Sequence, residues 1–120
     1  FFPAVDYAQI DRLRRRLMQE MSAAFQGVDA LIGPHYAGGA LLATNCTGHP
    51  QLAFRAGYAQ TPNRDLFDDP AKAQGAATVK TPRGVSLWAN LFEEGKIIAL
   101  GRALEAALGV AAERPPGFSR

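Results

Sequence analysis

The sequence predicts an α/β or α+β fold in which helices flank a sheet, within a single domain that spans residues 1–120. Two amphipathic segments near the two ends have apolar residues at the three- and four-residue spacing of a helix. Three shorter segments between them have the apolar or alternating pattern of strands. This order indicates helices packed on a sheet around one core, and 120 residues is close to the commonest domain size.

The first helix is expected from Asp6 onward. Asp6 and Gln9 resemble a capping box, Asp11 and Arg15 are spaced as a favourable ion pair, and Gly27 is placed to end the helix. One apolar stripe follows the helical period and comprises Ile10, Leu13, Leu17, Met21 and Ala24.

Three strands are expected between the helices. Residues 28–34 form a short apolar run between chain breakers, while residues 51–58 and 84–90 alternate between apolar and polar or small side chains. The glycine-bearing segment HYAGGA, residues 35–40, is expected to be a loop. Residues 59–83, rich in Pro, Asp, Asn, Ala and Gly, are expected to form a long loop or insertion.

The second helix is expected in the segment EEGKIIALGRALEAALG. It has two acidic residues in its first turn and Gly109 at its end. Its apolar stripe comprises Ile97, Gly101, Leu104 and Leu108. Residues 110–120 read as a proline-containing tail.

Charge and cysteine content favour a soluble chain in the cytosol. The net charge is +2, and the basic run Arg12–Arg16 lies off the apolar stripe, which favours a solvated helix face over a nucleic-acid site. A single cysteine cannot form an internal disulfide. No stretch has the composition of a membrane span or signal peptide, and the start at Phe1 leads us to expect processing or truncation.

Cys46 and His49 lie three residues apart but do not make a metal site by themselves. Zinc needs three or four ligands, and His35 is the only other histidine. We therefore expect no metal and a buried or partly buried Cys46 thiol. A Cys/His dyad would also need an orienting group and an oxyanion hole, and no cofactor motif is present. No serine lies in a Gly-x-Ser-x-Gly turn.

Four segments in this order resemble the C-terminal portion of the amidase signature family. They are DYAQIDRLRRRLMQEMSAAFQGVDALIGP, TNCTGHPQLAFRAGY, RGVSLWANLFEEGKIIALGRALEAALG and ERPPGF. The resemblance implies an α/β fold around a large mixed sheet flanked by helices, and an amidase-type hydrolase or amidotransferase that acts on carbon–nitrogen amide bonds. It also implies that NCTGHP is a turn into a strand, with His49 at a position where relatives carry leucine.

The resemblance implies no catalytic residue in this chain. The family's two serines and its lysine lie upstream in a Gly/Ser-rich stretch, and no such stretch is present. The remainder of the amidase chain is the expected partner, and the isolated chain is expected to be inactive. His35 and Tyr36, in the loop that follows the ALIGP run, are expected contacts beside the acyl pocket.

Two other functions remain open from the sequence. One is a non-catalytic interaction domain with an amidase-derived scaffold, and the other is a small basic module that binds nucleic acid through Arg12–Arg16. If the strands belong to a larger sheet, the isolated chain would expose apolar surface and an unpaired edge. We therefore expect the isolated chain to self-associate as a dimer.

Overall fold

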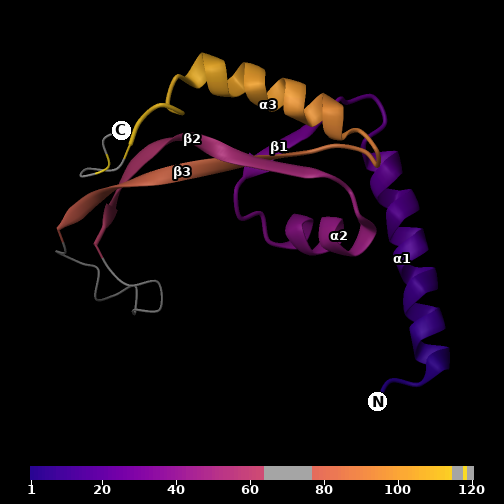
Figure 1. Cartoon of the computed structure of the whole chain (residues 1–120). Helices are drawn as coiled ribbons and strands as arrows, with labels where there is room; N and C mark the ends of the chain where they lie inside the picture. The colour runs from indigo at the N-terminus through magenta and orange to yellow at the C-terminus, as the bar shows by residue number, and fades with distance from the viewer. Residues whose placement is uncertain (64–76, 115–117, 119–120) are drawn as a thin grey trace.

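A computed structural model describes residues 1–63, 77–114 and 118 (Figure 1). Along the chain its elements are α1 (Ala4–Ala24), β1 (Leu31–Pro34), α2 (Gly39–Thr47), β2 (Gln51–Pro62), β3 (Thr78–Trp88) and α3 (Glu94–Leu108). The predicted combination of helices with a sheet is confirmed. The described strands have the order β1-β3-β2, and both pairings are antiparallel.

Strands β2 and β3 form a long, twisted pair that extends well past the predicted strand ends. Their register begins with Gln51 opposite Trp88 and ends with Pro62 opposite Thr78. The prediction that residues 59–83 are a loop was therefore wrong for 59–62 and 78–83, and residues 64–76 lie outside the described part. The third strand also begins at Thr78 rather than Gly84 and ends at Trp88 rather than Asn90.

Proline explains why the start of β3 was missed. Strand β1 pairs only with residues 85–88 of β3, so Pro82 lies where β3 has a described neighbour on one side alone, a setting that tolerates proline. The register shifts between Arg55 and Gly57, which interrupts the alternation of side chains along β2.

Helix α3 packs on the sheet through Ile97, Gly101 and Leu104 of its predicted stripe, whereas Leu108 is 44% exposed. Leu87, Ala89 and Ile97 are buried together, with Leu52, Phe54, Leu104 and Ala30 packed around them. Gly101 faces Leu52 so closely that a Cβ atom would overlap the leucine side chain. Gly109 ends the helix in the left-handed conformation at φ 67°, as expected. Figure 1 shows α3 over one side of the sheet and α2 toward the other.

Helix α2 was not expected, because Gly38 and Gly39 and its short length favoured a loop. Thr44 and Thr47, both buried, donate their hydroxyl hydrogens to the carbonyl oxygens of Ala40 and Ala43 at 2.9 and 2.8 Å. The predicted turn at NCTGHP was therefore wrong for residues 45–47, which are helical, while Gly48 ends the helix at φ 80°.

Helix α1 has different ends from those predicted. It starts after Pro3 with no side-chain cap, so the capping box at Asp6 was wrong, and it ends at Ala24 rather than Gly27. Asp11 lies 3.6 Å from Arg14, and no ion pair of Asp11 with Arg15 forms among the described residues. The next strand begins at Leu31 rather than Val28, because residues 25–27 form a turn and residue 29 lies in a bend.

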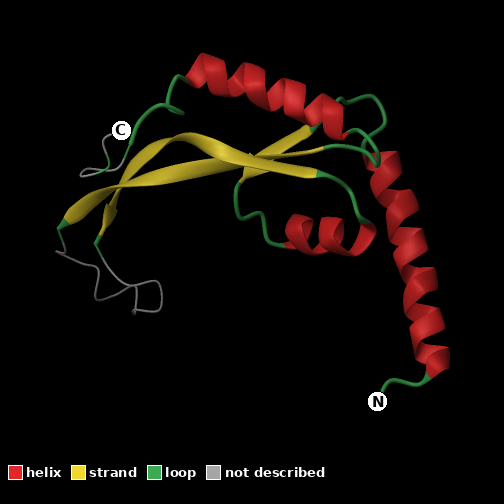
Figure 2. Cartoon of the chain, in the orientation of Figure 1, coloured by secondary structure: helices red, strands yellow, loops and turns green. Residues whose placement is uncertain are grey.

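The apolar stripe of α1 is mostly uncovered. No residue of α1 is buried, and Ile10 and Leu13 are 52% and 65% exposed. Figure 2 shows the N-terminal half of α1 projecting away from the sheet. Among the described residues, α1 therefore leaves most of its apolar face without a neighbour.

Candidate functional site

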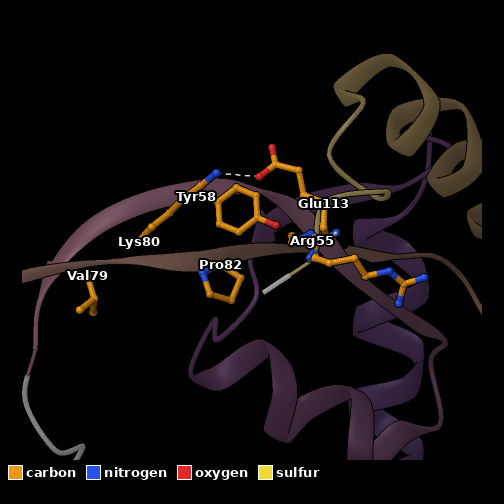
Figure 3. Close-up of a pocket in the computed structure, with 7 residues that line it drawn as sticks. Arg55, Tyr58, Val79, Lys80, Pro82 and Glu113 are labelled. Atoms are coloured by element: carbon orange, nitrogen blue, oxygen red, sulfur yellow. Dashed lines mark hydrogen bonds and ion pairs between the residues drawn. The ribbon is translucent and has the colours of Figure 1, made fainter. Parts of the chain in front are cut away.

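A cavity lies where the β2–β3 pair meets the segment that follows α3 (Figure 3). It encloses about 530 Å³, a volume typical of small-molecule sites. Strands β2 and β3 contribute most of its wall, and the segment after α3 closes it. Its lining residues are Arg55, Tyr58, Val79, Lys80, Pro82, Glu113 and Arg114.

The Tyr58 ring lies beside two cations in this cavity. The Lys80 ammonium is 4.1 Å from the ring centroid, and the Arg55 guanidinium carbon is 5.3 Å from it. Lys80 also donates a hydrogen bond to a Glu113 carboxylate oxygen at 2.6 Å. The cavity thus combines an aromatic wall with charges that come from three separate parts of the sequence.

Arg55 holds the segment after α3 in place. Its Nη2 atom donates to the carbonyl oxygens of Val110, Ala111 and Glu113 at 2.5, 2.8 and 3.0 Å. These carbonyls follow the end of α3, where backbone oxygens have no partner within the helix. The described lining residues include no serine, threonine, cysteine or histidine, so this cavity is equipped to bind a ligand rather than to cleave one.

His35 and Tyr36 lie close in sequence but differ in their surroundings. The His35 backbone N–H donates to the Gly84 carbonyl oxygen at 3.2 Å, and the His35 side chain packs over the Cα of Gly84. His35 also lines a more open cavity of about 320 Å³ with Arg55, Pro82 and Arg83. Tyr36 is 81% exposed and lines neither cavity. Their contact with an acyl pocket stays a prediction.

Cys46 and His49 lie in different surroundings, because Cys46 is exposed and His49 is buried. Cys46 is exposed in the last turn of α2, so the prediction of a buried or partly buried thiol was wrong. Helix α1 approaches the backbone here, since Arg14 Nε donates to the Cys46 carbonyl oxygen at 2.8 Å. In the described ranges, no three His, Cys, Asp or Glu side chains form a group that could hold a metal ion.

His49 is instead a buried structural residue. It is 4% exposed, its Nδ1 lies 2.7 Å from Thr47 Oγ1, and its ring stacks on Phe25 at a centroid distance of 5.6 Å. Burial lowers the pKa of His49, and the side chain of Asn90, which favours the charged form, counteracts only part of this effect. The His49 ring therefore contacts the residue that follows α1 and the last residue of α2, just before β2 begins.

The basic run on α1 is partly engaged within the chain. Besides the Arg14 contact with α2, Arg16 Nε lies 2.9 Å from a Glu20 carboxylate oxygen, and Arg12 Nη1 donates to Gln9 Oε1 at 3.4 Å. The carboxylates of Glu20 and Asp11 offset part of the positive charge of this run, and binding to phosphates depends on the density of that charge. None of the described helices is long and apolar enough to cross a membrane.

Comparison with known proteins gives three similar sequences, each named as the A subunit of a glutamyl-tRNA(Gln) amidotransferase. The protein from Prochlorococcus marinus is 30% identical over 125 residues and matches 92% of this chain. Those from Rhodopirellula baltica and Chlorobium chlorochromatii are 30% and 29% identical and match 94% and 84%. The chain belongs to the amidase signature family.

This member of the amidase signature family spans only a fraction of its relatives. The matches cover 22–23% of the length of the three amidotransferase proteins. No family model matches the chain, and no solved structure matches it. The cavity beside Tyr58 could not have been found by sequence reasoning, because no motif links Arg55 and Tyr58 to Glu113.

Proposed function

We propose that this chain is the C-terminal, non-catalytic portion of an amidase signature protein that acts on carbon–nitrogen amide bonds. The observation that carries the proposal is the match itself: at least 84% of the chain aligns with proteins of which it covers less than a quarter. In this proposal the nucleophile and the groups that activate it belong to the remaining three-quarters of the protein.

The uncovered surface supports a scaffold role within a larger protein. Strand β1 pairs on one side with β3 and has no partner on its other edge among the described residues. Leu31 and Ile32 of β1 are 42% and 61% exposed, and the stripe of α1 is uncovered as well. Apolar surface and an open strand edge of this kind are normally covered by further chain.

The loop after β1 is the part of this chain that we place beside the substrate. It carries His35 and Tyr36, and Tyr36 extends into solvent in this structure. In the proposed protein these side chains border the acyl pocket without taking part in bond cleavage. Such a role would affect the choice of substrate more than the rate of the chemical step.

The reading frame that encodes this chain tests the proposal directly. We expect the frame to continue upstream through a Gly/Ser-rich stretch that contains a lysine and two serines. Sequencing of the locus or of its transcript gives the answer without any assumption about folding. An in-frame start codon immediately before Phe1 would contradict the proposal and favour a free-standing interaction domain.

A further inference from the structure

We propose that the cavity beside Tyr58 binds a small organic anion with a flat apolar body, of the aryl carboxylate class. This inference is independent of amide chemistry, because it concerns a site on the β2–β3 pair and the segment after α3. Three features support it: the apolar wall of the cavity, the charges of the lining side chains, and the N–H donors of Arg55 and Lys80 that form no hydrogen bond among the described residues.

The wall of the cavity suits a flat apolar group. Tyr58 lies directly opposite Pro82 in the register of the two strands, and Val79 lies nearer the start of β3. Figure 3 shows the Tyr58 and Pro82 rings close to each other at the cavity, with Lys80 and Glu113 above the tyrosine. Aromatic ligands stack favourably on such rings, whereas a strongly hydrated inorganic ion gains nothing from them.

The charges around the cavity favour an anion. Among the described lining residues, Arg55, Lys80 and Arg114 are three cations and Glu113 is one carboxylate, so positive charge is in excess. Glu113 offsets one of the cations by pairing with Lys80. A bound carboxylate would accept charge-assisted hydrogen bonds from these cations, and such bonds are roughly twice as strong as those between neutral groups.

Two of these cations retain donors for a ligand. The three hydrogen bonds from Arg55 to the segment after α3 all come from Nη2, which leaves Nη1 for another acceptor. Lys80 has three N–H donors, and within the described part of the chain it uses one, on Glu113. We therefore place the ligand carboxylate between Lys80 and Arg55 and the ligand ring against Tyr58.

Titration of the 120-residue chain with benzoate, followed by two-dimensional NMR of backbone amides, tests the proposal. Shift changes are expected to saturate below about 20 mM benzoate and to centre on Tyr58, Val79 and Lys80. Benzamide has the same shape without the charge, and acetate has the charge without the ring. Both are expected to bind at least about ten-fold more weakly, the equivalent of about 1.4 kcal/mol.

Two variants with opposite expected effects make the test specific. Lys80→Gln removes a ligand contact and is expected to weaken benzoate binding about ten-fold. Glu113→Gln removes the carboxylate that competes for Lys80 and is expected to strengthen it. Arg102→Gln, on the exposed surface of α3 and outside the cavity, is the matched control and is expected to leave binding unchanged.

Three outcomes would overturn the proposal. One is no saturable shift with benzoate, which would mean that the cavity serves only to hold the segment after α3. If benzamide bound as tightly as benzoate, the ligand would not need a negative charge. If acetate bound as tightly as benzoate, the ligand would not need an aromatic ring. The amidase assignment would be unaffected by any of these results.

Discussion

His49 is the residue whose chemistry depends most on the fold. Thr47 Oγ1 donates its one hydrogen to the carbonyl oxygen of Ala43, so it acts as the acceptor in its short contact with His49 Nδ1. The ring proton of His49 is therefore on Nδ1. The neutral ring then stacks on Phe25 in a space closed to water. Protonation would place a charge there, which is the reason that burial lowers the pKa of His49.

We predict that the chain becomes less stable as pH falls through about 6.5. The pKa of His49 is lower in the folded chain than its ordinary value of 6.5, so the unfolded chain binds the proton more readily. The free energy of unfolding therefore decreases below that pH and levels off below the folded pKa. Urea unfolding at pH 7.5 and 5.5 measures the decrease.

His35 supplies the matched control for this prediction. His49→Gln is expected to lose part of the difference in stability between the two pH values, whereas His35→Gln, at an exposed position, keeps it. If the difference were the same in the wild type and in both variants, His49 would not be its source.

Two glycines of α3 are expected to respond in opposite directions. Gly101→Leu would force a side chain into Leu52 and lower the free energy of unfolding by about 1–3 kcal/mol or more. Gly95 has open space around its Cα, so Gly95→Ala is expected to be neutral or to stabilise by up to about 1 kcal/mol. Denaturant unfolding compares the two, and equal stability of both variants would contradict the packing of α3 on the sheet.

At the scale of elements, α1 is a helix with an apolar face, and no other described element covers most of that face. We predict that the double variant Ile10→Gln, Leu13→Gln changes the stability of the monomer by less than about 0.5 kcal/mol, because both side chains are exposed. The same variant is expected to weaken any association of the isolated chain. Analytical ultracentrifugation and thermal unfolding give the two quantities, and a large loss of monomer stability would show that α1 is covered from within.

The helices and strands that could be predicted from the sequence are those whose patterns are local. The stripe from Ile97 to Leu104 and the glycine at position 109 predicted α3 almost residue for residue. Helix α2 is short and begins with glycine, and the hydroxyls of Thr44 and Thr47 bond to its own backbone. Its apolar positions follow no clear helical period, so the sequence indicated a loop.

The candidate site was harder to predict because tertiary contacts assemble it. Arg55 and Glu113 are 58 residues apart, and neither belongs to a recognisable motif. The prediction that residues 59–83 form a loop also placed Val79, Lys80 and Pro82 outside the sheet, whereas all three belong to β3. Proline and polar residues at the ends of a strand pair have the composition of a loop, and only pairing with the opposite strand distinguishes them.

For the whole molecule, the uncovered surface predicts self-association of the isolated chain. Ile10 and Leu13 of α1 and Leu31 and Ile32 of β1 are exposed, and the second edge of β1 has no partner among the described residues. A second copy of the chain can cover such apolar side chains and such an edge. Light scattering across the micromolar range is expected to give the mass of a dimer, and a monomeric mass at every concentration would contradict this prediction.

The central claim is that this chain contributes scaffold and no catalytic group to an amidase signature protein. Ammonia release from simple amides, measured for the purified chain alone and for the complete reading frame, tests it most directly. We predict turnover by the complete protein and none by the isolated chain, because acyl transfer needs an activated nucleophile and oxyanion donors held together. Turnover by the isolated chain that survived repurification, and that disappeared when one of its residues was changed, would contradict the claim.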